Sequence, residues 1–371
     1  MVQANPISKI TIRGFKSIRN LEELKLSQLN ILIGANGTGK SNFIAYFKLL
    51  SEILHSRLQV FTSQQGGADR ILSYGIKETQ SLYSFIKFGL NGYLFELLPT
   101  LSSGFTFASE KLYFSGVYFG EKWEDLGSGH AESSLEGAAL FENHNNDVTA
   151  FCYAAISSWR VYHFHDTSDT AGVKRLGSLQ DNIYLRSDAS NLAAFLFKLK
   201  AYYPEVYQQI IKVIRLALPY FADFVLNPQT LSSGEEQIRL LWQQSDSDYP
   251  LWPSQLSDGS LRFICLVTAL MQPLPPSTII IDEPELGLHP YAITLLGGLL
   301  RSAATRMQVI ISTQSVTLLN EFQLDDLIIV ERKDGASTFR RMNSADYSQW
   351  LEEYSVGELW EKNILGGRPR S

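Results

Sequence analysis

The spacing of apolar and polar positions predicts the first elements of the chain. Alternation over residues 7–12 predicts a strand, and the apolar run over residues 29–33 is typical of a buried strand that enters a turn at Gly34. Residues 41–54 place their large apolar side chains on one helical face. Residues 81–119 are aromatic and β-branched with glycine breaks, so we expect an antiparallel meander there.

The middle of the chain changes character. Residues 121–147 are rich in Gly, Ser, Glu and Asn and predict a long exposed excursion. Residues 159–165 predict another strand. Residues 191–218 have a helical pattern that is interrupted near Pro204, because proline lacks the amide that a helix interior needs.

The last third alternates helical and strand patterns. An apolar helix is expected over residues 261–271, followed by short apolar runs at 278–281, 308–311 and 327–330. Helical stretches separate these runs, which favours parallel βαβ units. Residues 345–362 are expected to form one amphipathic helix.

Together these elements predict an α/β fold with a mixed central sheet, an antiparallel β lobe and a helical insertion. We expect the N- and C-terminal segments to meet in one sheet. The expected divisions are 1–120, 121–225, 226–345 and 346–371. The sequence shows no sustained heptads, so no coiled-coil arm is expected.

Composition and charge restrict the expected partners and cellular compartment. The chain has 371 residues and a net charge of -6, so a broad basic surface for nucleic acid is not implied. No apolar stretch is long enough for a membrane helix, so no membrane partner is expected. The two cysteines, Cys152 and Cys265, form no CxxC pair, which favours a reducing cytoplasm.

The residues from Gly34 to Ser41 read Gly-Ala-Asn-Gly-Thr-Gly-Lys-Ser, which matches GxxxxGK[ST] between a predicted strand and a predicted helix. Its glycines let successive amides point at phosphate oxygens, and the following helix offers its positive end to the same anion. Lys40 would reach the β- and γ-phosphates, and the Ser41 hydroxyl would contact Mg²⁺. We expect ATP contacts from Asn36, Gly37, Thr38, Gly39, Lys40 and Ser41.

A second motif, a pair of acidic residues, follows the predicted strand 278–281. Asp282 would hold Mg²⁺ at the carboxyl end of that strand, and Glu283 would act as general base on the attacking water. An apolar run ending in Asp-Glu is common by itself. Combined with the phosphate loop, it favours ATP hydrolysis.

The segment Gln255-Leu-Ser-Asp-Gly-Ser260 lies 25 residues before Asp282 (282 minus 257) and opens an apolar helix. It resembles the signature of ABC ATPases in the LSDG form of RecF-like proteins. In that family the signature of one subunit caps the γ-phosphate held by the other. The resemblance assigns ATP contacts to Ser257 and Gly259. An ordinary helix cap is the alternative interpretation.

Two further segments extend the resemblance. Pro284 to Pro290 resembles the D-loop of SMC- and RecF-like heads, with His289 as a structural or interface residue. Gln314 follows a predicted strand where ABC ATPases place the switch residue, usually His. We expect a catalytic role for Gln314; because Gln carries no positive charge, slow turnover is expected. By contrast, Leu231 to Gln237 is close to LSGGQ in letters but is expected to be a hairpin turn.

The GFKS segment at residues 14–17 and the ending from Gly357 to Gly367 also match this group. The chain is similar to the stand-alone bacterial "predicted AAA-family ATPases", which are ABC-type proteins of the SMC/RecF-like group. That resemblance implies a P-loop NTPase of the SMC-head type and a homodimer around ATP and Mg²⁺. It favours a role in DNA maintenance or anti-phage defence, with DNA as a candidate partner. The alternative is a nucleotide-gated switch for a separately encoded nuclease or toxin.

Some candidates stay open or are set aside. Gln64 and Gln65 are the candidates for the family's Q-loop glutamine. His163 and His165 have the spacing of a metal pair on one strand face, but no further ligand cluster accompanies them. The segment beginning at His144 lacks the flanking ligands of an HNH nuclease. The 57 residues after Gln314 (371 minus 314) are too few for a Toprim nuclease, so any DNA cleavage is expected from a partner.

Overall fold

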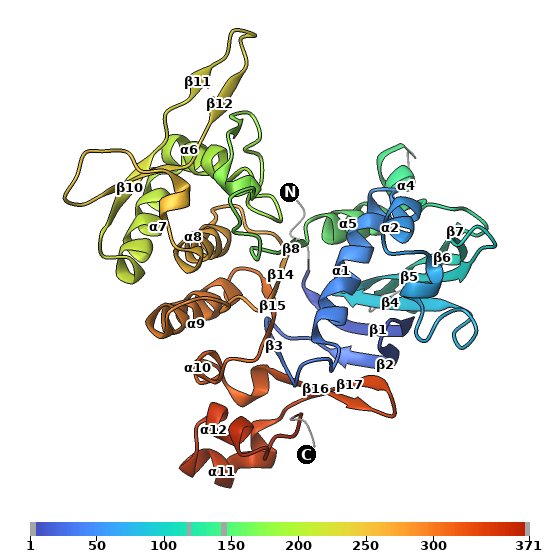
Figure 1. Cartoon of the computed structure of the whole chain (residues 1–371). Helices are drawn as coiled ribbons and strands as arrows, with labels where there is room; N and C mark the ends of the chain where they lie inside the picture. Colours follow the sequence, from blue (N-terminus) through green and yellow to red (C-terminus); the bar gives the residue numbers. More distant parts are fainter. Residues whose placement is uncertain (1–4, 117–119, 142–146, 368–371) are drawn as a thin grey trace.

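The computed structural model describes residues 5–116, 120–141 and 147–367 (Figure 1). His144 lies outside these ranges. Two six-stranded sheets, one central and one antiparallel, form the body of the protein. Helices α8 (Asp258–Met271) and α9 (Pro290–Ala304) lie on the opposite side of the central sheet from α1 (Lys40–Leu54) (Figure 1). In the described part of the chain no helix has the length and apolar character needed to cross a bilayer.

The central sheet joins segments from the two ends of the chain. β3 pairs in parallel with β15 on one side and β16 on the other, and β14 continues the parallel array to the edge strand β8. The predicted meeting of N- and C-terminal segments is therefore confirmed. In spatial order the strands are β17 (Ala336–Arg341), β16 (Leu327–Lys333), β3 (Leu29–Ile33), β15 (Gln308–Thr313), β14 (Thr278–Asp282) and β8 (Arg160–Tyr162).

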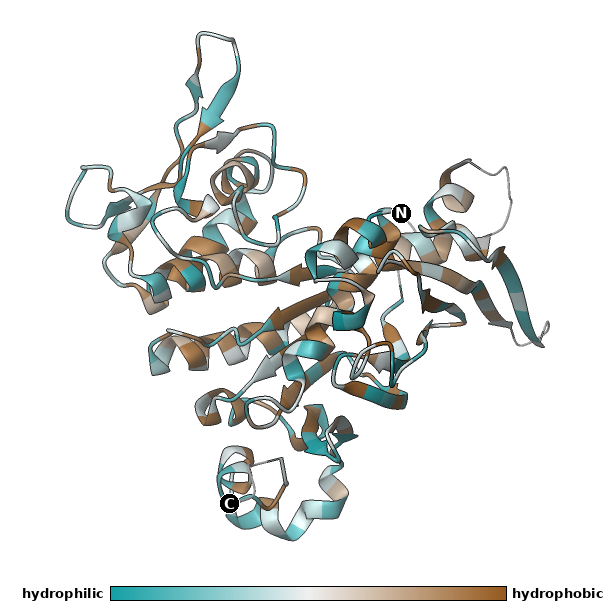
Figure 2. Ribbon diagram, turned by 45° about the vertical axis from the view of Figure 1, so that its right-hand side comes forward, coloured by the Kyte–Doolittle hydropathy of each residue, from teal (hydrophilic) through white to brown (hydrophobic). Residues whose placement is uncertain are grey.

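Alternate residues of these strands face two separate cores. Ile279 and Ile281 of β14 belong to one hydrophobic cluster, and Ile280 belongs to the other. The inner strands β3, β14 and β15 are buried on both faces, which explains their nearly continuous apolar runs. Figure 2 shows these central strands in brown. The first core contains α8 (Asp258–Met271), α9 (Pro290–Ala304) and α10 (Val316–Leu319).

The second core lies between the central sheet and the antiparallel sheet, where α1 (Lys40–Leu54) is packed. The antiparallel sheet confirms the predicted meander, and the burial of β4 alternates along the strand. Its strands, in spatial order, are β2 (Ile18–Lys25), β1 (Ile7–Phe15), β4 (Leu82–Phe88), β5 (Asn91–Pro99), β6 (Phe105–Gly116) and β7 (Gly120–Gly127). Short helices α2 (Leu58–Gln64) and α3 (Ala68–Ile71) follow α1.

The exposed excursion expected over residues 121–147 is wrong for much of that segment. β7 pairs with β6 as the edge strand of the antiparallel sheet. Helices α4 (Leu135–Phe141) and α5 (Asp147–Ser157) follow, and α5 packs against α1. Most residues of β7 are polar, and all are exposed or half-buried. The two apolar residues, Trp123 and Leu126, do not alternate, so no sequence pattern marks the strand.

A helical lobe is built on α6 (Leu192–Tyr202) and α7 (Pro204–Ala217), which confirms the break near Pro204. A small sheet of β10 (Phe221–Val225) and β13 (Leu241–Gln244) packs beside α7. The hairpin of β11 (Gln229–Thr230) and β12 (Glu236–Ile238) projects beyond it, with β9 (Gly177–Ser178) alongside (Figure 1). Leu231 to Gln237 therefore contains a hairpin turn, as expected.

The single helix expected over residues 345–362 is wrong. The segment forms α11 (Ser348–Glu353) and α12 (Val356–Glu361), and Tyr354 between them has an extended backbone. The Ser355 side chain accepts the Glu358 amide and the Glu358 carboxylate accepts the Ser355 amide, a capping box that starts a new helix. The remaining short 3₁₀ turns are η1 (Gly172–Lys174), η2 (Pro253–Gln255), η3 (Leu324–Asp326) and η4 (Ser344–Tyr347).

Candidate functional site

The predicted phosphate loop connects the end of β3 to the first residue of α1. Gly37 and Gly39 have φ angles of 77° and 110°, which favour glycine. A Cβ on Gly37 would meet no atom within 4 Å, so this side of the loop is open. Asn36, Gly37 and Ser41 are exposed, with Ser41 in the first turn of α1. The amides and the helix N-terminus thus form an accessible cradle that fits a phosphate group.

The other side of the loop is closed by two hairpins. A Cβ on Gly39 would collide with the hydroxyl groups of Ser17 and Ser337. Ser337 donates to the Thr38 carbonyl at 2.5 Å, and Asn42 donates to Ser17 at 2.7 Å. The β1–β2 and β16–β17 hairpins therefore fix the loop from behind.

Lys40 is buried against its own loop. Its Nζ donates to the carbonyl oxygens of Gly34 at 2.7 Å and Ala35 at 3.1 Å. Burial lowers the pKa of Lys40, while the carboxylates of Glu283 and Asp282 act in the opposite direction. The Lys40 ammonium therefore lies within electrostatic reach of the predicted catalytic acids.

The two acids and Gln314 gather at the ends of β14 and β15. The Ser312 hydroxyl donates to Asp282, and the Glu283 amide donates to the Ser312 carbonyl at 3.0 Å. Gln314 Nε2 donates to Glu283 Oε1 at 2.6 Å. Glu283 has a φ of 43°, a strained value for a side chain of this size. The predicted base and the predicted switch residue are thus in direct contact.

Glu285 is a residue whose role the sequence interpretation missed. Its Oε1 accepts from the Thr313 hydroxyl at 2.5 Å and from the Gln314 amide at 3.2 Å. Its Oε2 is buried without a hydrogen-bond partner among the described residues. Burial raises the pKa of Glu285. Glu285 ties the D-loop segment to the switch loop; its position in the Pro-Glu motif was the available signal.

The predicted signature begins α8, and its Ser257 Oγ accepts the Ser260 amide at 3.1 Å as an N-cap. A Cβ on Gly259 would overlap the carbonyl oxygen of Gly287. Arg262 donates to the Leu286 carbonyl at 2.7 Å. The signature and the D-loop are therefore packed into one unit. Within the described ranges, no hydrogen bond or ion pair joins Ser257 or Gly259 to the phosphate loop of the same chain.

His163 and His289 lie on different elements of the structure. His163 directly follows β8, next to the strand that ends in Asp282. Burial lowers the pKa of His163, the Lys48 charge lowers it further, and Asp282 acts in the opposite direction. No group of three or more potential metal ligands occurs among the residues that the structure describes. His289 caps α9, where its Nδ1 accepts the Tyr291 amide at 3.3 Å.

The Q-loop candidates lie at the C-terminal end of α2. Gln64 and Gln65 are exposed at the end of α2, a helix that packs against α1 and β6. The strand beside β14 is β8, so the residue next to Asp282 from that side is His163. The sequence spacing alone could not show which strand lies beside β14.

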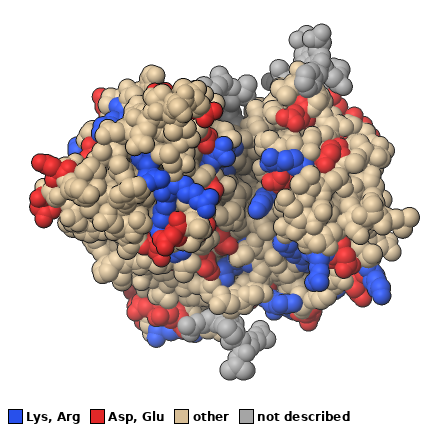
Figure 3. All heavy atoms as spheres, turned by 45° about the horizontal axis from the view of Figure 1, so that its top comes forward, with Lys and Arg blue, Asp and Glu red and all other residues tan. Residues whose placement is uncertain are grey.

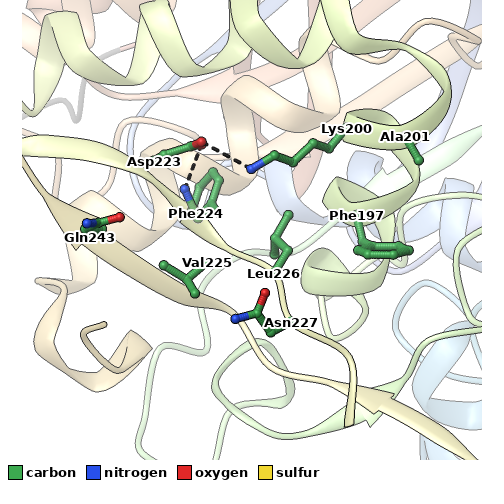
Figure 4. Close-up of a pocket in the computed structure, with 9 residues that line it drawn as sticks. All are labelled: Phe197, Lys200, Ala201, Asp223, Phe224, Val225, Leu226, Asn227 and Gln243. Carbon is green, nitrogen blue, oxygen red and sulfur yellow. Dashed lines mark hydrogen bonds and ion pairs between the residues drawn. The ribbon is translucent and has the colours of Figure 1, made fainter. Parts of the chain in front are cut away.

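A separate cleft of about 480 Å³ lies in the helical lobe between α6 and β10 (Figure 4). Its single lining carboxylate, Asp223, accepts from Lys200 at 3.2 Å and from Tyr207 at 2.6 Å. This carboxylate is already satisfied by its neighbours. We assign the cleft no role in nucleotide chemistry.

Comparison with known structures identifies the class of fold. The chain is similar to an Smc head bound to the C-winged helix domain of ScpA, with 14% identity and a TM-score of 0.56, covering 93% of this chain and 99% of that chain. It is also similar to an Smc head domain with an extended coiled coil bound to the C-terminal domain of ScpA, derived from Pyrococcus furiosus, with 13% identity, a TM-score of 0.57 and coverage of 94% and 99%. The fold is that of an ABC-type SMC head, as predicted.

The family follows from the sequence. Residues 29–320 match the family described as "AAA domain, putative AbiEii toxin, Type IV TA system". This match spans more than half of the chain, so the protein belongs to that family of AAA-domain ATPases. No curated protein matches the chain.

Proposed function

We propose that this protein hydrolyses ATP with Mg²⁺ at the carboxyl ends of the parallel strands of the central sheet. The supporting observation is the convergence of the phosphate loop, the acids after β14 and Gln314 after β15 at the carboxyl ends of adjacent parallel strands. In open α/β sheets, ligands bind beyond the carboxyl ends of the strands. The open cradle at Gly37 and the electrostatic coupling of Lys40 to the acids fit a triphosphate and its metal.

In the proposed reaction, the phosphate-loop amides and Lys40 bind the phosphate oxygens. Ser41 and Asp282 would hold Mg²⁺, which supplies charge neutralisation when bound. Glu283 takes a proton from water as the water oxygen bonds to the γ-phosphorus. The bond from that phosphorus to the bridging oxygen breaks, and ADP and phosphate leave.

Gln314 orients the Glu283 carboxylate through their 2.6 Å hydrogen bond. A glutamine donates a hydrogen bond but supplies no positive charge to the transferring phosphoryl group. We therefore propose slow turnover. His163, beside Asp282, is proposed to line the site at the carboxyl ends of these strands.

The active form is proposed to be a dimer in which the signature of one chain faces the phosphate loop of the other. Ser257 and Gly259 lie at the N-terminus of α8, where a helix favours an anion. Ser257 is hydrogen-bonded within the first turn of α8, Gly259 packs against Gly287, and Arg262 of the same helix donates to the Leu286 carbonyl. Among the described residues neither Ser257 nor Gly259 has a hydrogen bond to its own phosphate loop, so a second copy would complete each site.

Phosphate release tests the enzymatic proposal. Wild-type protein should release phosphate from Mg-ATP, whereas Glu283→Gln should bind ATP and release little. Lys40→Ala should neither bind nor hydrolyse. Equal release by wild type and Glu283→Gln, after removal of contaminating ATPases, would contradict the assignment of the base.

For the biological role, we propose DNA maintenance or anti-phage defence in the cytoplasm. The space-filling view shows Lys and Arg side chains, interspersed with Asp and Glu, on both sides of a hollow between two lobes (Figure 3). The basic side chains could contact a polyanion there. Both cysteines are free and buried, consistent with a reducing compartment. Duplex DNA should raise the rate of phosphate release.

The second candidate role is a nucleotide-gated switch for a nuclease or toxin. The matching family is described as a putative toxin of a type IV toxin–antitoxin system, which favours this role. A neighbour-encoded protein that co-purifies with the ATP-bound form, combined with a rate that DNA leaves unchanged, would support this role over the first.

A further inference from the structure

The last described residues of the chain contact the phosphate loop. The Ala35 amide donates to the Gly367 carbonyl at 2.9 Å, and the Gly367 amide donates to Glu331 Oε1 at 2.6 Å. Arg340 donates to the Leu365 carbonyl at 2.8 Å. The segment is therefore held at three backbone positions, and one of its carbonyls satisfies an amide of the loop that is expected to bind phosphate.

The same segment is also attached to the switch loop. Helix α10 begins directly after Gln314, with Ser315 as its N-cap. Asn320, at the end of α10, accepts the Gly357 amide at 2.8 Å. A Cβ on Gly357 would meet Asn320 and Val316 at 2.5 and 2.8 Å, so α12 lies directly against α10.

Buried side chains of residues 356–367 connect the contact with the phosphate loop to the contact with α10. Leu359, Trp360 and Leu365 are buried in the core that also contains α10. Gly367 has a φ of 83°, and a Cβ there would lie 2.8 Å from the Trp360 ring and 2.9 Å from Ile329. Only glycine fits this turn without moving the segment away from the phosphate loop.

We propose that residues 356–367 form a C-terminal bridge that couples the switch loop at Gln314 to the phosphate loop at Ala35. Gly367 is its positioning residue: the docked bridge holds the loop in the conformation that binds ATP. This inference rests on the proposed ATP site. Because coupling between two binding events is reciprocal, ATP must also tighten the docking of the bridge.

The test compares two substitutions at glycines of similar backbone strain. Gly367→Ala displaces the bridge, whereas Gly234→Ala is the matched control, since Gly234 has a φ of 86° in the projecting hairpin and open space around its Cβ position. Binding of a fluorescent ATP analogue is titrated with Mg²⁺. Hydrogen exchange is followed in peptides covering residues 34–41 and 356–367, with and without Mg-ATP.

Loss of one backbone hydrogen bond predicts about two- to tenfold weaker ATP binding in Gly367→Ala than in the control. The exchange of the phosphate-loop peptide should accelerate relative to the control even without ATP. KM should rise more than kcat falls, since the bridge acts on binding. In wild-type protein, Mg-ATP should slow exchange of the bridge.

A second variant keeps the proposal testable if Gly367→Ala folds poorly. Glu331→Ala removes the acceptor of the Gly367 amide without altering the backbone of the bridge, and it should weaken ATP binding in the same direction. ATP affinity and loop exchange equal to the Gly234→Ala control in both variants would overturn the bridge while leaving the ATP site intact. A wild-type protein that does not bind ATP would instead overturn the proposed function, and the bridge with it.

Discussion

The contact between the signature and the D-loop supports a quantitative prediction for Gly259→Ala. A Cβ at this position would overlap the Gly287 carbonyl oxygen and lie 3.2 Å from its carbonyl carbon. The two backbone segments must therefore separate by about 1 Å to restore van der Waals contact. Such overpacking typically destabilises a fold by about 1–3 kcal/mol.

The larger effect is expected on catalysis. Because Ser257 caps the same helix, a shift of about 1 Å would move it relative to the γ-phosphate that the second subunit holds in the proposed dimer. Misplacement of this size can reduce a rate by about 100-fold. Gly298→Ala in α9 is the control, since its Cβ would meet nothing closer than 3.9 Å. Both variants share the helix-propensity gain of alanine, so their difference isolates the steric clash.

Two assays measure the difference: the free energy of unfolding in urea and phosphate release at saturating Mg-ATP. Gly259→Ala should lose both stability and turnover relative to Gly298→Ala. Equal values in the two variants would refute the reasoning, because the signature and the D-loop would then separate freely and their contact would have no functional consequence.

Three further predictions concern single side chains of the site. ATP at about 100 times its dissociation constant should stabilise wild-type protein by about 2.7 kcal/mol and Lys40→Ala by nothing, as measured by thermal unfolding; equal protection of both would exclude the phosphate loop. Gln314→Ala removes the hydrogen bond to Glu283 and should slow single-turnover hydrolysis by about 10- to 100-fold, whereas an unchanged rate would assign Gln314 a structural role. Because burial raises the pKa of Glu285, its stabilising contribution is lost as pH rises through the folded pKa. The stability of Glu285→Gln relative to wild type in urea unfolding should therefore increase as pH rises above about 4.3, the ordinary pKa of a glutamate; a difference independent of pH would contradict the buried charge.

The central elements were predictable because each has a strong local signal. Both faces of the strand 278–281 and of β3 are buried, and their residues are apolar except for Thr278 and Asn30. The order of the motifs predicted the SMC-head fold. In contrast, β7 is a polar edge strand, and its pairing with β6 depends on a long-range contact that no local pattern encodes.

The candidate site was only partly predictable for a similar reason. The residue types at Lys40 and Asp282 indicate their chemistry wherever the fold places them. His163 gains its position from the pairing of β8 with β14, and Gly367 reaches Ala35 across most of the chain. Such contacts depend on strand order and on the path of the last residues, which the spacing of motifs does not determine.

The most direct test of the central claim is the solution mass of Glu283→Gln protein by light scattering, with and without Mg-ATP. One chain has a mass of 41.7 kDa. We predict twice this mass only with Mg-ATP, and a single-chain mass when Ser257→Arg is added to the same protein. A mass that ATP leaves unchanged, or a dimer that persists with Ser257→Arg, would contradict a signature that acts across the interface.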